Sequence, residues 1–216
     1  MNFEQLITIG GLLLKGLQDT LWITVSCFLT AFASGLVIAV LRRWLAAGFA
    51  RRLLDIWVFV LRSVPVLVLL FLIYFGLPAY GFRPTPLLAM NLSLGLISGA
   101  YMAEVFRGSL AGVNPTEIEA ALAQGFTRAQ VIRYIEFPQM LRFSTPGLLN
   151  ELTSILKSAP FAYTVGITEI LGQSRALIAS TMLGINIYIV AGLIYFCIYK
   201  LIVAALQPLI NKYLAP

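Results

Sequence analysis

At 216 residues, of which 60% are hydrophobic and 11% are charged, the chain has the composition of one integral membrane domain rather than a soluble one. The net charge of +6 does not indicate a nucleic-acid-binding protein, because the basic residues flank apolar runs instead of covering one soluble face. The chain has no His, and Cys27 and Cys197 both lie in apolar runs, so we expect no zinc or haem site and no disulfide.

Residues 1–19 carry charges of both signs and predict a short amphipathic entry helix. The first 20 residues lack a basic start and a cleavage site, so no removable signal peptide is expected. Apolar segments that can cross a bilayer follow at residues 20–41, 56–77, 86–106, 143–161 and 185–206. A mixed connector precedes the last segment, which is expected to end at Pro208. The sequence therefore predicts an all-α membrane protein of one domain, residues 1–216, with about five transmembrane helices.

The longest polar interval, residues 114–142, lies between the third and fourth apolar segments and is called the polar segment below. Asn114 is a typical N-cap, with Pro115 at the first helical position and Glu117 at the third. Both polar side chains can accept hydrogen bonds from the free amides of the first turn. Gly125 stands where a short helix would end in a left-handed conformation.

Thr127 predicts the start of a second helix, because Gln130 three residues later completes a capping box. Pro138 is expected to end this helix, since the residue before a proline disfavours helical geometry. Two short helices joined at a glycine, between apolar segments, indicate a docking element for a partner protein.

Charge in the loops predicts the orientation of the five spans. The second and fourth loops carry only Arg83 and Arg175 as basic residues, whereas the first and third carry eight arginines. Because basic residues accumulate in cytoplasmic loops, we expect the N-terminus outside and the polar segment and C-terminus in the cytoplasm. The eight arginines are Arg42, Arg43, Arg51, Arg52, Arg107, Arg128, Arg133 and Arg142.

Ionisable residues inside the spans are costly, so each indicates function or a buried pair. The candidates are Arg62, Glu104, Glu151 and Lys157. Glu104 and Arg107 lie three apart on one helix face and can simply neutralise each other. Glu151 and Lys157 are six apart, which places them on different faces of a regular helix.

Prolines interrupt two spans, each three residues after a basic residue: Pro65 follows Arg62, and Pro160 follows Lys157. Each proline removes a backbone hydrogen bond. Paired interruptions of this kind indicate a substrate site near the membrane midplane, with ordinary kinks as the alternative. The candidate pathway residues are Arg62, Ser63, Pro65, Glu104, Glu151, Lys157, Ser158 and Pro160.

In the polar segment, Glu119-Ala120-Ala121 followed by Gly125, Ile135 and Pro138 resembles the signature loop of ABC importer permeases, where E-A-A is followed by G and I-x-x-P. The wider text, Tyr101-Met102-Ala103-Glu104 through Arg107-Gly108 to Phe137-Pro138-Gln139, resembles the polar amino acid uptake subfamily. The resemblance covers about residues 16–206 and implies a type I fold, with a cytoplasmic two-helix coupling loop at about 114–138.

The resemblance also implies that the loop couples to an ATPase, through Glu119, Ala120, Ala121, Gly125, Ile135 and Pro138. Glu119 would face a basic rim on the partner, and Gly125 would permit the bend between the helices. The alternative is that Glu119 is a solvated charge and Gly125 a plain helix cap.

The chain departs from this family at two places. Amino acid permeases commonly read R-G-T-P-L-L-V-Q where residues 62–69 read R-S-V-P-V-L-V-L, and K-D-T-S-L where residues 157–161 read K-S-A-P-F. Apolar residues, Val64 and Leu69 among them, thus replace groups able to bind an amino acid, although the basic residue of each motif remains. Either the site takes a less polar or acidic substrate, or a second permease supplies the polar contacts.

No nucleotide-binding G-x-x-x-x-G-K-[ST] loop is present, so we expect no enzyme activity and no cofactor in this chain, with ATP and Mg bound by partner ATPases. The expected function is that of a permease subunit of a bacterial inner-membrane ABC importer for an amino acid or similar small polar solute. Its expected partners are the same or a homologous permease, two ATPases, an extracytoplasmic solute-binding protein and membrane lipid. A passive channel subunit and a non-transporting assembly subunit of a membrane enzyme are the alternatives. The solute, and the choice between homodimer and heterodimer, stay open.

Overall fold

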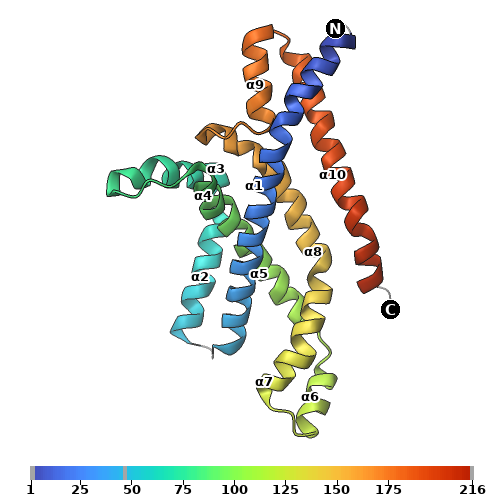
Figure 1. Ribbon diagram of the computed structural model, residues 1–216. Helices are drawn as coiled ribbons and strands as arrows, with labels where there is room; N and C mark the ends of the chain where they lie inside the picture. Colours follow the sequence, from blue (N-terminus) through green and yellow to red (C-terminus); the bar gives the residue numbers. More distant parts are fainter. Residues whose placement is uncertain (1–2, 46–47, 215–216) are drawn as a thin grey trace.

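The computed structural model describes residues 3–45 and 48–214, and every regular element within these ranges is a helix. The first helix, α1 (Phe3–Trp44), has 42 residues. At 1.5 Å per residue it is roughly 63 Å long, about twice the thickness of the hydrocarbon core of a bilayer. The entry helix and the first span, predicted as separate, are therefore one helix (Figure 1). The charge that suggested a boundary does not interrupt it, because Lys15 points away from the packed side and is exposed.

The second apolar segment is a bent pair of helices. After α2 (Phe49–Ser63), the chain turns by 101° at Pro65 into α3 (Val66–Phe71). Pro65 has extended backbone, with φ −60° and ψ 134°, and α2 ends before it as the ring geometry requires. The run continues through the π-helical turn η1 (Leu72–Gly76) and the 3-10 turn η2 (Leu77–Tyr80).

The third apolar segment packs closely on α1. It consists of α4 (Pro86–Met90), the π-helical turn η3 (Asn91–Gly95) and α5 (Leu96–Ala111). A Cβ on Gly99 would lie 2.0 Å from Ser34 Oγ, and one on Gly35 would lie 2.8 Å from the Gly99 carbonyl oxygen. Small residues therefore let the two backbones approach each other, as is common between membrane helices.

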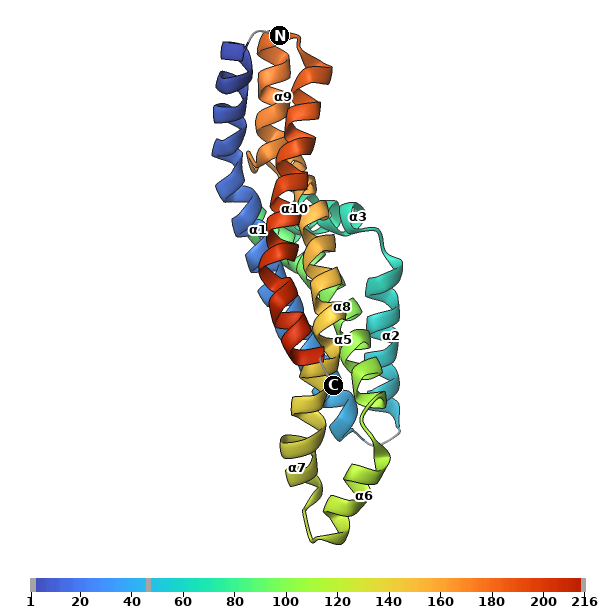
Figure 2. The ribbon, with the colours of Figure 1, turned by 90° about the vertical axis from the view of Figure 1, so that its right-hand side faces the viewer.

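The polar segment projects beyond the helix bundle in both views (Figures 1 and 2). It contains α6 (Pro115–Ala123) and α7 (Arg128–Val131), followed by the π-helical turn η4 (Ile132–Glu136) and α8 (Phe137–Ser158). The end of the molecule that carries α6 and α7 is called the loop end below. The opposite end, where α1 begins and α9 lies, is the N-terminal end.

The last third of the chain contains the 3-10 helix η5 (Ala159–Val165), α9 (Ile170–Thr181) and α10 (Gly184–Leu214). The predicted connector is thus largely a helix. The stretch of α10 that can cross a membrane, Gly184–Pro208, ends at Pro208 as expected, although the helix itself continues to Leu214. A proline inside a helix removes one backbone hydrogen bond, and neighbouring turns can absorb that loss in a membrane helix.

Three of the described helical stretches are long and apolar enough to cross a membrane: Ile9–Trp44, Pro86–Ala111 and Gly184–Pro208. The bent pair that begins with α2 gives a fourth if it is counted as one span. α8 is not among them, because its apolar residues alternate with Arg142, Glu151, Lys157 and several hydroxyl side chains. The fifth span stays a prediction.

Buried apolar side chains form a central cluster and a second one at the N-terminal end. The central cluster, with Met102, Phe106 and Met140, joins α1, α5 and α8. The second cluster, with Leu13, Ile170 and Ile187, joins the first turns of α1 to α9 and α10. α1 therefore runs through both parts of the molecule and connects them.

Candidate functional site

The first helix of the polar segment begins and ends as its sequence predicts. Asn114 Oδ1 accepts a hydrogen bond from the Thr116 amide at 3.0 Å, and Gly125 has a left-handed φ of 87°. Glu117 does not cap this helix as predicted. Its carboxylate instead accepts a hydrogen bond from Gln139 Nε2 at 2.6 Å, because α8 starts alongside α6 and offers a donor. This contact connects α6 to α8.

The second helix has the predicted capping box, in which Thr127 Oγ1 accepts from the Gln130 amide and Gln130 Oε1 accepts from the Thr127 amide. The prediction that Pro138 ends this helix is wrong. The chain stays helical from Arg128 to Ser158, since Pro138 falls in the first turn of α8, directly after the π-helical turn η4. A π-helical turn has wider hydrogen-bond spacing, which relieves the demand for an amide donor at the following residue.

The six predicted coupling residues differ in exposure. Glu119, Ala120, Gly125 and Pro138 are exposed, Ile135 is half-buried, and Ala121 is buried. Glu119 and Ala120 lie on α6 and Gly125 in the turn that follows it, at the part of the molecule that projects from the bundle (Figure 1), whereas Pro138 lies in the first turn of α8. A partner approaching the loop end would therefore meet Glu119, Ala120 and Gly125 first.

An ion pair connects the polar segment to the end of α1. Arg43 Nε donates to Glu136 Oε2 at 2.7 Å, and a second bond joins Arg43 Nη2 to the other carboxylate oxygen. Glu136 is only 3% exposed, and Arg128 lies 4.0 Å from it. A buried carboxylate held by a two-pronged guanidinium is a strong contact, so the end of α1 and η4 are tied together.

A second set of ion pairs joins three helices at the loop end. Arg42, on α1, binds Asp55 on α2 at 2.7 Å and Glu104 on α5 at 2.6 Å. Glu104 also binds Arg107 at 2.8 Å, which is the mutual neutralisation that the sequence left as an alternative. Both oxygens of Glu104 are therefore engaged by arginines.

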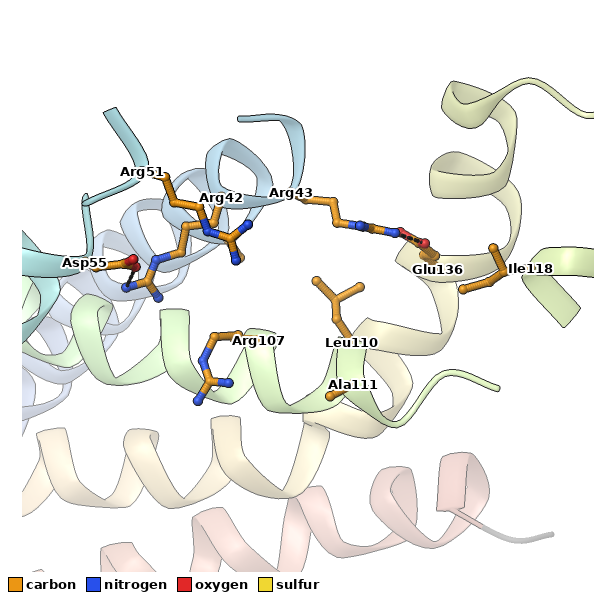
Figure 3. Close-up of a pocket in the computed structure, with 10 residues that line it drawn as sticks. Arg42, Arg43, Arg51, Asp55, Arg107, Leu110, Ala111, Ile118 and Glu136 are labelled. Carbon is orange, nitrogen blue, oxygen red and sulfur yellow. Dashed lines mark hydrogen bonds and ion pairs between the residues drawn. The ribbon is translucent and has the colours of Figure 1, made fainter. Parts of the chain in front are cut away.

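These ion pairs surround a cavity of about 270 Å³, called the basic cavity below (Figure 3). Arg42, Arg51 and Arg107 reach it from three different helices, and Arg43 extends across one side toward Glu136. The lining residues are Ala39, Arg42, Arg43, Arg51, Asp55, Arg107, Leu110, Ala111, Ile118 and Glu136. The cavity thus touches α6, through Ile118, as well as the ends of three helices of the bundle.

Of the candidate pathway residues, Arg62 and Glu151 come together. The Glu151 carboxylate accepts a hydrogen bond from Ser98 and interacts electrostatically with Arg62. The Arg62 guanidinium lies 4.9 Å from the centre of the Tyr101 ring, and the Tyr101 hydroxyl donates to the Arg62 carbonyl oxygen at 3.3 Å. Arg62 is thus close enough to Glu151, on another helix, for the two charges to interact, although the ion pairs of the described residues do not include this pair.

Lys157 faces a different part of the molecule. Its Nζ lies 5.2 Å from the centre of the Tyr199 ring on α10, and the side chain is exposed. Glu151 is buried on another side of α8, as the six-residue separation predicts. Ser158 ends α8 and Pro160 lies in the 3-10 turn that follows, while Ser63 closes α2 with its hydroxyl bonded to the Phe59 carbonyl at 2.8 Å. Within the described residues, the residues around Pro65 and those around Pro160 therefore have different neighbours and do not form one site.

Sequence reasoning missed Glu169, which is fully buried at the N-terminal end. Its carboxylate accepts hydrogen bonds from the Leu171 and Gly172 amides, each at 2.7 Å, and from the Tyr195 hydroxyl at 2.6 Å. Burial raises the pKa of this carboxyl, against the lowering effect of the same hydrogen bonds. Only its position at the start of α9 could have indicated a helix cap, and glutamate is an uncommon residue there.

Residues 31–213 match the protein family described as the binding-protein-dependent transport system inner membrane component. The chain is 34% identical over 202 residues to the histidine/lysine/arginine/ornithine transport system permease protein HisQ of Escherichia coli (strain K12), with 86% of each chain covered. It is 29% identical over 215 residues to the probable amino-acid permease protein YxeN of Bacillus subtilis (strain 168), which covers 98% of this chain and 95% of that protein.

Among solved structures, a chain from the crystal structure of an amino acid ABC transporter with histidines has the same fold. The TM-score is 0.90 at 27% sequence identity, and the match covers 98% of this chain and 99% of that one.

Proposed function

The chain belongs to the family of binding-protein-dependent transport system inner membrane components, and from this membership we propose that it forms, with a second permease subunit, the translocation pathway of an amino acid importer. Separate ATPase subunits would bind ATP and Mg and supply the energy, and an extracytoplasmic binding protein would deliver the solute. The family is one of transporter permeases, not of catalytic enzymes. The passive channel and the assembly subunit are not favoured by relatives that are named as transport permeases.

The polar segment supports this proposal most directly. It offers Glu119 and Ala120 on an exposed helix, and Glu117 and Glu136 connect that region to α8 and α1. A force applied to α6 would therefore reach two long helices through short polar contacts. This is the arrangement that coupling to a separate ATPase requires.

Coupling is tested by Glu119→Lys, assayed in vesicles together with the ATPase and the binding protein. We expect the variant to insert normally but to lose transport and binding-protein-stimulated ATP hydrolysis, because like charges would oppose a basic partner surface. Gln124→Lys is a matched control, since it adds the same side chain about 140° around the same helix. Wild-type transport by Glu119→Lys, or flux without ATP in the wild type, would remove the coupling proposal.

For the solute, we propose that Arg62 and Glu151 lie at the pathway and that Lys157 lies beside α10, where a second subunit could complete a site. In the same vesicles, Arg62→Met should lower substrate-stimulated uptake more than basal ATP hydrolysis, because a carboxylate solute would lose its cationic partner. Equal loss of both activities would instead assign Arg62 to helix packing with Glu151.

The proposed orientation places the N-terminus outside and the polar segment and C-terminus in the cytoplasm, with five spans. Reporter fusions after Trp44 and Gln130 should report the cytoplasm, and fusions after Gly81 and Gln173 the outside. A cytoplasmic signal at Gly81 would contradict the five-span arrangement.

A further inference from the structure

The basic cavity carries more positive than negative charge. Four arginines line it against two carboxylates, those of Asp55 and Glu136. Glu104 lies behind the wall and is shared by Arg42 and Arg107. Even with this third carboxylate, one guanidinium remains in excess around a cavity of about 270 Å³.

Among the described residues that line the cavity, Arg51 is the arginine that forms no ion pair with a carboxylate. Among the ion pairs formed by the residues that the structure describes, none includes Arg51, although its side chain lines the cavity. The excess charge is therefore located on α2, where Arg51 lies next to Arg42 of α1 and Arg107 approaches from α5 (Figure 3).

Arg42 supplies a second, independent sign of an unfilled contact. Its side chain is only 8% exposed, and its two terminal nitrogens are bound to Asp55 and Glu104. Its Nε is buried and has no hydrogen-bond acceptor among the described residues. A buried donor that stays unpaired destabilises the molecule, so an acceptor that reached this wall would stabilise it.

We propose that the basic cavity binds a phosphate-type oxyanion, held by Arg51 and Arg107 beside the wall that Arg42 forms. Guanidinium groups that arrive from different helices suit a tetrahedral group with oxygens in several directions, whereas one guanidinium fork would satisfy a planar carboxylate. The bound group would connect α1, α2 and α5 beside Ile118 of α6, and so would stabilise one arrangement of the loop end.

The oxyanion has two possible sources, a free phosphate or the headgroup of an anionic lipid. Trp44, Phe49 and Trp57 are exposed on the same two helices that carry Arg42 and Arg51. Aromatic residues at such positions are typical of the membrane–water interface, where lipid phosphates lie. The proposal concerns this cavity alone and does not depend on the transported solute.

The test uses the intact permease assembled with its partner subunits in phosphatidylcholine nanodiscs. The melting temperature is followed while sodium phosphate replaces sodium chloride at constant ionic strength, for the wild type, Arg51→Gln, Arg51→Lys and Arg52→Gln. A separate arm measures by native mass spectrometry how many phosphatidylglycerol molecules each variant retains. Arg52→Gln is the matched control, since it removes the same charge from the adjacent residue, which does not line the cavity.

We expect Arg51→Gln to weaken phosphate-dependent stabilisation about 10-fold, Arg51→Lys to lie between it and the wild type, and Arg52→Gln to change it less than about twofold. Loss of retained phosphatidylglycerol in Arg51→Gln, without a response to phosphate, would identify the lipid headgroup as the source and support the same site. Any binding to the ATPase subunits would be equal in all variants. Identical behaviour of Arg51→Gln and Arg52→Gln in both arms would overturn the proposal.

Discussion

At its N-terminal end, α1 is held by uncharged contacts, and at its loop end by ion pairs. A Cβ on Gly16 would lie 2.6 Å from the carbonyl carbon of Glu169, so the backbones of α1 and the start of α9 are in direct contact. At the other end of the same helix, Arg42 and Arg43 bind carboxylates from α2, α5 and η4. One helix thus uses two kinds of attachment.

The two kinds of attachment respond differently to movement. A close backbone contact is lost or becomes a clash within a few tenths of an ångström, so it fixes α1 against α9. An ion pair weakens gradually with distance, and a guanidinium has five donors with which to exchange partners. We infer that α9 is fixed against α1, and that α2 and η4, which α1 holds through ion pairs, are the parts able to adjust at the loop end.

The largest effect is expected at the loop end, from breaking the ion pair of Arg43 with Glu136. Arg43→Gln leaves a carboxylate that is 3% exposed without its main partner, which should cost about 3–5 kcal/mol of unfolding free energy. A denaturing-detergent titration of the purified protein measures it. Arg107→Gln is the control, because this side chain is 60% exposed and Glu104 keeps Arg42, so the cost should stay below about 1 kcal/mol.

The double variant Arg43→Gln with Glu136→Gln sharpens this test. If a lone buried charge causes the loss, removing both charges should restore much of the stability of Arg43→Gln. A double variant as unstable as the single one would mean that the packing of Arg43, and not its charge, holds η4 to α1.

A smaller effect is expected at the N-terminal end, from adding one methyl group. Gly16→Ala places a Cβ against the backbone of Glu169 and Ile170, which cannot move as a flexible side chain could, so about 1–3 kcal/mol should be lost. Gly11→Ala is the matched control on the same helix, since nothing lies within 4 Å of its Cβ position. The melting temperatures of the two purified variants make the comparison. Equal values for Gly16→Ala and Gly11→Ala would contradict a fixed contact between α1 and α9.

The features that could be predicted from the sequence depend on residues close together in the chain. The N-cap at Asn114, the left-handed Gly125 and the capping box of Thr127 each follow from side chains within a few positions. The apolar segments are equally local, because a run of about 20 apolar residues indicates a span by itself. Pro138 misled the prediction because a proline costs a helix one hydrogen bond without requiring it to end.

The contacts that define the loop end could not be predicted in this way. Arg42 and Glu104 are 62 residues apart, and Arg43 and Glu136 are 93 apart, so their pairing follows only from the arrangement of the helices. In the sequence, Arg42 and Arg43 only follow the first apolar segment, and nothing near them in the chain indicates their partners. The same limit applies to Glu169, whose three donors come from two helices.

The smallest effect is expected midway between the two ends, at a hydrogen-bonded side chain between α1 and η3. Thr30 Oγ1 donates to Asn91 Oδ1 at 2.8 Å, and Asn91 Nδ2 donates to the Leu87 carbonyl at 2.8 Å and to Ser26 Oγ at 3.3 Å. Asn91→Leu should cost about 0.6–2 kcal/mol, the range for such bonds between membrane helices, because the unfolded chain in a membrane also finds partners. Thr30→Val removes the same bond and keeps the shape of the side chain that packs beside Gly95. The double variant should therefore lose little more unfolding free energy than Asn91→Leu alone. Unfolding free energies of the two single variants and the double variant complete the cycle. Strict additivity would show that Asn91 acts through Ser26 of α1 or through its own helix, and not through Thr30.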